Sequence, residues 1–451
     1  MKIGVAIVKI KRNINPSKTL VLGFAILILV GATLLSLPAA TENGEGLPFL
    51  KALFTATSAT CVTGLVVVDT GSTFSLFGEL VILSLIQIGG LGFMTFASFI
   101  FMLLGKRISL KERLVLKEAI NVNDFTGIGI LVRRILLFTG VIEFSGALLL
   151  AIRFSYDMPI GKAIYYGVFH SISNFNNAGF DLLGGFRSLT SYVDDPVIVL
   201  TICALITLGG IGFIVMNDLY EYRKTRKLSL HTKIMLITSI SLTLFGTIAI
   251  YLLELGNTKT FGPLSPLGQV LGALFQSVTS RTAGANTLPI GDLTHATLLI
   301  MMFLMFIGGG SGSTAGGIKV TTFVVLLATV WSQIKGREDI VIFKKRLVKE
   351  IVFKAFTVAM CGFAIVAFVT FILSITDTGH HFIMYLFEAT SAFGTVGLTM
   401  GLTTELSPIG QLLIILTMFA GRLGPLTIGI AITRRRQKET FHRPKGNIMI
   451  G

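Results

Sequence analysis

Long stretches without a charged residue recur along this chain, and short basic tracts separate them. Residues 298–307 read LLIMMFLMFI, and residues 320–330 read VTTFVVLLATV. Such runs lack the in-out alternation of barrel strands. Because backbone polar groups in lipid must be paired within the protein, the runs predict transmembrane helices. Only 14% of the 451 residues are charged, against about 25% in soluble domains. The sequence therefore predicts an all-α polytopic membrane protein.

The net charge of +15 is carried by short tracts between the apolar stretches. These tracts are KIKRN at 9–13, GKRISLKER at 105–113, EYRKTRK at 221–227, FKKRLVK at 343–349 and RRRQK at 434–438. Lys and Arg gather in the cytoplasmic loops of membrane proteins. We therefore expect the tracts and both termini to be cytoplasmic in a protein of the cell membrane, surrounded by lipid. Since they form no basic face on a folded domain, nucleic-acid binding is excluded.

Neither the cysteines nor the histidines suggest a reaction centre. Cys61, Cys203 and Cys361 are too few for a disulfide framework, and no CxxC pair or histidine cluster indicates a metal site. The six histidines are dispersed, and no Ser-His-Asp set can be argued. The chain is therefore predicted not to be an enzyme and to carry no covalently bound cofactor.

Four short segments of the chain resemble one another, which predicts an internal repeat. They are LFTATSATCVTGL at 53–65, VFHSISNFNNAGF at 168–180, LFQSVTSRTAGA at 274–285 and LFEATSAFGTVGL at 386–398. A second set of related segments follows them: IGGLGF at 88–93, LGGIGF at 208–213, IGGGSG at 307–312 and AGRLGP at 420–425. Single packing glycines are common in membrane helices, but they do not explain four segments of shared pattern.

The repeats predict four tandem pore units around one central pore. These units are residues 19–104, 129–220, 230–330 and 347–433, joined by cytoplasmic linkers 105–128, 221–229 and 331–346 and flanked by terminal segments 1–18 and 434–451. The stretch before each first-set glycine is about a dozen residues, which as a helix spans ~18 Å, too short for a ~30 Å bilayer core. Each unit should therefore contain an outer helix, a re-entrant pore helix with a descending segment, and an inner helix.

The descending segments, called the filter segments below, are 61–64, 176–179, 281–284 and 394–397. Around one axis their unpaired carbonyls would form a ring of the kind that replaces the hydration shell of potassium. The pore helices would also aim their negative ends at the axis. The candidate filter residues are Cys61, Val62, Thr63, Gly64, Asn176, Asn177, Ala178, Gly179, Arg281, Thr282, Ala283, Gly284, Gly394, Thr395, Val396 and Gly397.

The motifs IQIGGLGFMTF, RTAG and SAFGTVGLTMGL, with the four repeats, resemble the Trk/Ktr/HKT superfamily of potassium transporters. The resemblance covers residues 17–433 and is greatest to the membrane subunit of bacterial Ktr systems. It implies one pore per chain, a homodimer, and a separate cytosolic ring of nucleotide-binding RCK subunits. It also implies potassium as the substrate ion, with sodium as a candidate coupling or activating ion.

The glycine-rich stretch GGGSGSTAGGIK at 308–319 interrupts the third inner helix. It does not match the GxxxxGK[ST] pattern of a phosphate-binding loop. We expect a loop that obstructs the pore below the filter and whose backbone is satisfied by pore water, rather than a plain flexible kink. The candidate gate residues are Gly308, Gly309, Gly310, Ser311, Gly312, Ser313, Thr314, Ala315, Gly316, Gly317, Lys319 and Arg422.

Charged residues inside the apolar stretches mark function or structural pairing. Arg422, at the position of Gly90 in the first repeat, is interpreted as a positive barrier, with snorkelling or structural pairing as the alternative. Arg281 is expected to anchor backbone behind the filter rather than face the pore. Glu143 should pair with Arg133, Arg134 or another buried donor. Glu388 is expected to cap the fourth pore helix or, second, to attract ions, and Asp69 and His381 should be solvated loop residues.

Two other classes of function stay open. A secondary transporter with broken helices would bind another cation or solute at mid-membrane, but it would be expected to show inverted repeats. Here the four units share one orientation. An enzyme or primary pump would need a nucleotide or phosphorylation motif, which this sequence lacks.

Overall fold

The structure is a computed structural model that describes residues 16–92, 94–98, 115–116 and 128–432. Most of the predicted N-terminal segment, most of linker 105–128 and the C-terminal tail 434–451 lie outside the described residues. The basic tracts at 9–13, 105–113 and 434–438 lie outside them as well.

Four long apolar helices surround the molecule: α1 (Pro16–Leu35), α7 (Ile128–Phe154), α11 (Leu230–Glu254) and α15 (Lys349–Thr376). Within the described ranges, these four helices are individually long and apolar enough to cross a membrane. Their outward faces carry exposed apolar side chains, such as Leu22, Phe144 and Phe363. In water such surfaces would be unfavourable, so they indicate contact with lipid.

Four shorter helices lie inside this ring of long helices and occupy the positions predicted for the pore helices. They are α2 (Phe49–Thr60), α8 (Ile160–Phe175), α12 (Pro266–Thr279) and α16 (Phe382–Gly394). Their C-terminal halves are almost completely buried, and many of the buried residues are Ser and Thr. A helix of 12 to 16 residues reaches about 18–24 Å, so each one ends inside the bilayer core.

The inner helices are α4 (Leu76–Leu91), α9 (Pro196–Gly210), α13 (His295–Ile307) and α17 (Pro408–Leu423). Each begins at a residue whose side chain accepts a backbone N–H of the first turn: Ser75, Asp195, Thr294 and Ser407. Such N-caps satisfy donors that would otherwise lack a partner in a helix inside the membrane.

All four inner helices end near mid-membrane, whereas the sequence analysis placed a break only in the third. The chain bends by 94° between α9 and α10 (Phe213–Thr225), and by 93° between α17 and α18 (Pro425–Ile432). α4 ends at Leu91, just before Gly92, and the 308–319 loop separates α13 from α14 (Val320–Ile334). Gly92, Gly212 and Gly424 have φ of 80°, 102° and 82°, which ends a helix.

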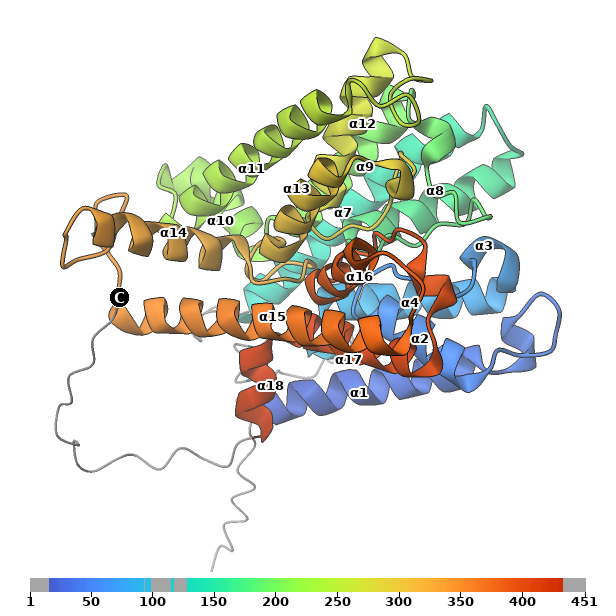
Figure 1. Ribbon diagram of the computed structural model, residues 1–451, viewed down its shortest axis with the longest axis horizontal. Coiled ribbons are helices and arrows are strands. Elements are labelled where there is room, and N and C mark those ends of the chain that lie inside the picture. Colours follow the sequence, from blue (N-terminus) through green and yellow to red (C-terminus); the bar gives the residue numbers. More distant parts are fainter. Residues whose placement is uncertain (1–15, 93, 99–114, 117–127, 433–451) are drawn as a thin grey trace, which may run out of the picture.

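The four units close into a ring. The inner helix of each unit packs against the pore helix of the next: α4 against α8, α9 against α12, α13 against α16, and α17 against α2. In Figure 1 the long helices run roughly along the horizontal direction, with α14 and α15 joined at one end and α3 (Thr70–Thr73) at the other. The fold is therefore a polytopic all-α membrane protein with four helix–pore-helix–helix units around one centre.

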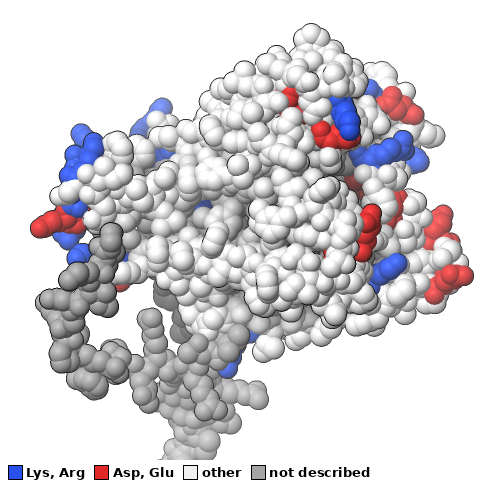
Figure 2. Space-filling view, in the orientation of Figure 1, with Lys and Arg blue, Asp and Glu red and all other residues white. Residues whose placement is uncertain are grey.

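The two ends of the molecule differ in charge. A short antiparallel hairpin of β1 (Val341–Ile342) and β2 (Lys345–Arg346) follows α14. Figure 2 shows mainly basic side chains at this end, and most of the visible acidic side chains, together with further basic ones, at the opposite end. We call these the basic end and the acidic end. Helices α10 and α14 extend to Thr225 and Ile334, so they run a few residues past the predicted limits at 220 and 330.

Candidate functional site

The four filter segments meet around one axis, as the contacts of their closing glycines show. A Cβ on Gly64 would lie 2.5 Å from the carbonyl oxygen of Ala178, and one on Gly284 would lie 2.5 Å from that of Val396. In the same way Gly179 faces Ala283 O, and Gly397 faces Thr63 O. The cycle runs through all four units and closes on itself. It therefore brings four carbonyl oxygens, one from each unit, into a ring that only glycine at the closing position permits.

The backbone of each filter segment alternates between left- and right-handed conformations. φ is positive at the closing glycine, and also two residues earlier, at Val62 (51°), Asn177 (59°), Thr282 (83°) and Thr395 (48°). Residues with a side chain seldom adopt positive φ, and such conformations concentrate at functional sites. In an extended chain successive carbonyl groups point to opposite sides of the backbone. Alternating left- and right-handed residues instead turn successive carbonyl groups toward the same side.

The amide groups of the filter segments are directed back toward their own pore helices. Thr63 N and Ala178 N each donate over 2.8 Å, to Ser58 O and Ser173 O, and Ala283 N and Val396 N each donate over 2.9 Å, to Thr279 O and Ser391 O. With their amides bonded behind them, the segments can present carbonyl oxygens to a cation on the axis. Oxygen cages of this kind suit an alkali-metal ion that has lost its hydration shell.

Four hydroxyl groups of the pore helices hold the filter segments, and the sequence analysis missed their role. Ser58 Oγ accepts Gly64 N (3.0 Å), Ser391 Oγ accepts Gly397 N (3.1 Å), Ser173 Oγ donates to Phe180 O (2.7 Å) and Thr279 Oγ1 donates to Ala285 O (2.5 Å). The signal was present in the sequence. A hydroxyl residue stands six positions before the closing glycine in the first, second and fourth repeats, and five positions before it in the third repeat.

The 308–319 loop lies directly beneath the filter segments. Thr314 Oγ1 donates to Phe175 O over 3.4 Å, at the end of the second pore helix. A Cβ on Gly316 would contact Thr395 and would lie 2.8 Å from Gly394 O, in the fourth filter segment. The loop thus touches two different units on the side of the filter that faces the basic end.

Protein groups hold the backbone of this loop, which corrects the expectation that pore water satisfies it. Gly310 N donates to Gly210 O (2.8 Å), Phe213 N donates to Gly312 O (2.9 Å), and Thr314 N is 3.4 Å from Gly209 O. Gly209 and Gly210 are the last residues of α9, where carbonyls have no partner within the helix. The break in the second inner helix therefore supplies the acceptors that fix the loop.

Arg422 lies opposite the loop and bonds both to it and to α4. Its guanidinium donates to Thr314 O, to Gly89 O (2.5 Å) and to Gly90 O (3.1 Å). Lys319 donates to Ala315 O within the loop. Both cations are thus placed at the centre of the molecule and bound only to neutral carbonyls in these contacts.

A family model for the cation transport protein TrkH matches residues 16–442. The chain belongs to this family. It is 44% identical over 437 residues to the Ktr system potassium uptake protein B of Bacillus subtilis (strain 168), covering 97% of each chain. It is 38% identical to the potassium/sodium uptake protein NtpJ of Enterococcus hirae, covering 98% of this chain and 99% of that protein.

The fold of this TrkH-family chain also matches a solved structure. The potassium transporter TrkH from Vibrio parahaemolyticus superposes with a TM-score of 0.73 at 19% identity, covering 94% of this chain and 86% of that one. The resemblance drawn from the motifs is therefore confirmed at the level of the Trk/Ktr superfamily of membrane subunits. The prediction that the chain is not an enzyme is confirmed as well, since the family and these relatives are transporters.

Arg281 lies in the third filter segment, but its side chain points away from the axis. Its guanidinium donates to Ser239 O (2.7 Å), to Ser239 Oγ (3.1 Å) and to Thr243 Oγ1 (3.0 Å), all on the outer helix α11. These contacts agree with an anchor behind the filter. Only the backbone of Arg281 is therefore available to the ring.

Glu143 is held by two buried amide donors, which agrees with the expectation of another buried donor in place of Arg133 or Arg134. Gln87 Nε2 and Asn176 Nδ2 donate to its two carboxylate oxygens over 3.2 and 3.0 Å. Arg134 instead donates to Asn217 Oδ1 (2.7 Å) and pairs with Glu221. Because Asn176 begins the second filter segment, Glu143 ties that segment to the outer helix α7.

Glu388 is not a helix cap, because α16 begins at Phe382 and Glu388 lies in its middle. Its carboxylate is fully buried and accepts the hydroxyls of Thr399 (2.7 Å) and Thr403. It therefore pins the chain just beyond the fourth filter segment. Asp69 is also more than a solvated residue, since it accepts Phe186 N over 3.0 Å and so links two loops at the acidic end. His381 is exposed, as expected.

Proposed function

We propose that this TrkH-family chain takes up potassium across the cell membrane through a filter of backbone carbonyls from its four units. The closed cycle of glycine-to-carbonyl contacts carries this proposal, because it provides a ring of neutral oxygen ligands with no acidic side chain in the filter segments. A ring of carbonyls favours a weakly hydrated cation such as potassium. The relatives named for potassium uptake support the same ion.

Sodium enters the proposal as a coupling or activating ion. One relative is named for potassium and sodium uptake.

We further propose that the chain forms a homodimer with one pore per chain. A cytosolic nucleotide-binding RCK ring would dock at the basic end, which would place both termini in the cytoplasm. The Ktr systems named among the relatives support this arrangement, as does the charge difference between the two ends.

The 308–319 loop and Arg422 form the proposed gate. The loop lies on the axis below the ring, and Arg422 places a fixed positive charge beside it. A passing cation would meet both a steric and an electrostatic barrier. Opening therefore requires the loop to leave the carbonyls of Gly209 and Gly210 and the guanidinium of Arg422.

A secondary transporter with broken helices remains the second candidate, and the breaks in all four inner helices are the observation that favours it. However, broken-helix transporters of that type are built from two inverted halves. The ring of four like units supports conduction along a central axis instead.

Uptake in cells that lack their own potassium transporters tests the proposal. Wild-type chain should restore growth on low potassium, and varying external sodium should reveal any coupling. Gly64→Ser should lower the preference for potassium over sodium, because its side chain would press on Ala178 O across the ring. Gly161→Ser is the matched control, since a Cβ there meets open space. Unchanged selectivity of a normally expressed Gly64→Ser protein would refute the filter assignment.

A further inference from the structure

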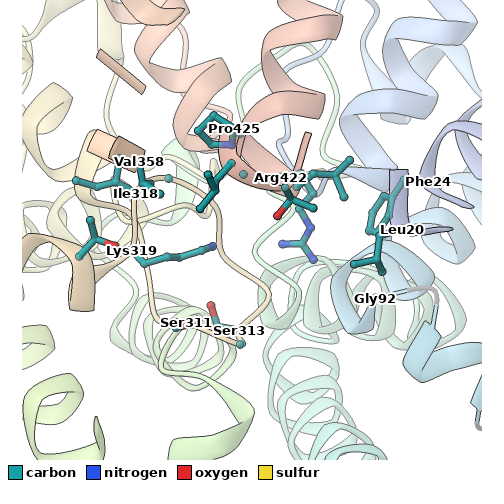
Figure 3. Close-up of a pocket in the computed structure, with 18 of the residues that line it drawn as sticks. Leu20, Phe24, Gly92, Ser311, Ser313, Ile318, Lys319, Val358, Arg422 and Pro425 are labelled. Atoms are coloured by element: carbon teal, nitrogen blue, oxygen red, sulfur yellow. The ribbon is translucent and has the colours of Figure 1, made fainter. Parts of the chain in front are cut away.

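A cavity of about 330 Å³ lies beside the gate, on the side of the basic end. The 308–319 loop and the broken ends of α4 and α17 form one part of its wall. The outer helices α1 and α15 and the short helix α18 form another part, and residues of α10 and α14 also line the cavity. Figure 3 shows Leu20 and Phe24 on one side of this space and Lys319, Ile318 and Val358 on the other. The cavity thus connects the region below the filter with helices that face lipid.

Among the described residues, three basic side chains line the cavity, Lys319, Lys354 and Arg422, and no acidic one does. The Lys319 and Arg422 side chains extend toward each other in Figure 3. Both side chains donate hydrogen bonds to neutral carbonyls. Two like charges that face each other away from bulk water repel strongly. An anion placed between them would remove this repulsion, so the lining favours an anionic group.

Much of the remaining lining is apolar, beside several Ser and Thr side chains, and the apolar part indicates the source of the anion. Leu20 and Phe24 of α1, Val358 of α15, and Leu426 and Ile430 of α18 line the cavity. These residues come from helices whose other faces meet the bilayer. A free inorganic anion would gain nothing from such walls, whereas an acyl chain would. Anionic phospholipids are also enriched in the cytoplasmic leaflet, where basic residues attract them.

We propose that the cavity binds the phosphate group and the first part of an acyl chain of an anionic phospholipid, and that this lipid opens the gate. The volume is at the lower end of ligand pockets, which fits part of a lipid rather than a whole one. Phosphate oxygens bind a guanidinium more strongly than neutral carbonyls do. A bound headgroup would therefore draw Arg422 away from Thr314 O and neutralise the positive charge beside the pore. The proposal that the lipid opens the gate rests on the proposed function, whereas the proposal that the cavity binds the lipid does not.

Native mass spectrometry of the purified protein tests binding directly. After reconstitution with phosphatidylcholine and phosphatidylglycerol, the wild-type protein should retain phosphatidylglycerol selectively. Lys354→Gln should weaken retention about fivefold, the effect of one lysine near anionic headgroups. Lys349→Gln is the matched control, because Lys349 is exposed on the same helix but does not line the cavity. Ile430→Trp narrows the apolar wall at a half-exposed site, and should also reduce retention. Equal retention by all four proteins would overturn the proposal.

Rubidium flux into proteoliposomes tests the opening effect. Phosphatidylglycerol should raise flux through the wild-type and Lys349→Gln proteins several-fold over phosphatidylcholine alone, and raise it clearly less in Lys354→Gln. If inorganic phosphate trapped in phosphatidylcholine vesicles gave the same stimulation, the ligand would be a free anion and the lipid assignment would be wrong. Selective lipid retention without any stimulation would refute the opening effect alone. A failure of potassium selectivity would leave the retention measurements unaffected.

Discussion

Replacing Arg422 should raise ion flux without changing selectivity. Arg422 holds the 308–319 loop in its closed position but does not contact the ring of filter carbonyls. Moving the loop off the axis must break two short backbone hydrogen bonds, Gly310 N to Gly210 O and Phe213 N to Gly312 O. It must also break two long bonds, Thr314 N to Gly209 O and Thr314 Oγ1 to Phe175 O, and the bond from Arg422 to Thr314 O. At about 1 kcal/mol for each neutral bond and 1.5–3 for the charge-assisted one, closure is favoured by roughly 5–7 kcal/mol.

Arg422→Ala removes the charge-assisted bond and should therefore increase the open population by about 10- to 150-fold. Loss of the charge acts in the same direction, since a cation ~4 Å from a fixed unit charge is repelled by roughly 4 kcal/mol at an effective dielectric constant of 20. The two effects are similar in size, so alanine alone cannot separate them. Arg422→Gln keeps a donor without the charge, and Arg422→Lys keeps the charge without the planar fork.

Rubidium flux in proteoliposomes, normalised to inserted protein, gives the comparison. We expect flux to increase in the order wild type, Lys, Gln, Ala. If the flux through Arg422→Lys equalled that through Arg422→Ala, the hydrogen bonds would be the larger effect. If the flux through Arg422→Gln equalled that through Arg422→Ala, the charge would be the larger effect. If Arg422→Ala were inserted and folded normally but carried no more flux than wild type, Arg422 would not be part of a barrier.

Three further predictions follow from the same structure. Deleting residues 311–315 should raise flux more than Arg422→Ala and keep potassium selectivity; a folded but inactive deletion would contradict the gate. Burial, with a smaller contribution from Asp69, raises the pKa of Asp181 at the acidic end to about 6, so this carboxyl gains a proton as pH falls through about 6. The raised pKa also means that ionisation of Asp181 destabilises the fold as pH rises from about 4 to 6, so Asp181→Asn should not lower Tm at pH 7. Deleting residues 434–451 should weaken co-purification with a cytosolic RCK ring, and undiminished co-purification would exclude the tail as a docking element.

The repeat pattern predicted much of this structure, because the local sequence determines the short pore helices and the closing glycines. A dozen small and apolar residues before a glycine can form only a short helix inside the bilayer, and α2 spans Phe49–Thr60 accordingly. The closing glycines could be predicted for the same reason, since their positive φ excludes most side chains. The breaks at Gly92, Gly212 and Gly424 carried a similar signal in the shared glycine motif, but the long apolar runs around them favoured continuous helices.

Contacts between distant parts of the chain could not be predicted in this way. Glu143 accepts from Gln87 and Asn176, which lie 56 and 33 residues away. Nothing in the local sequence of α7 distinguishes these amides from the nearby arginines as partners. Glu388 was misplaced for a different reason: the position of a carboxylate within a helix depends on where the helix begins, and helix ends are the least certain part of a sequence-based prediction.

The breaks of the inner helices explain how one gate arises from four similar units. A helix leaves its last four carbonyls without partners, and the breaks place such carbonyls beneath the filter, at Gly89 and Gly90 in the first unit and at Gly209 and Gly210 in the second. The third unit supplies the loop whose amides bind the second pair, and the fourth supplies Arg422, which binds the first pair and the loop. Each unit therefore contributes a different part of the gate from the same position in the repeat. A substitution that straightens the first or second inner helix, by giving those carbonyls amide partners within the helix, should weaken closure although it changes neither the loop nor Arg422.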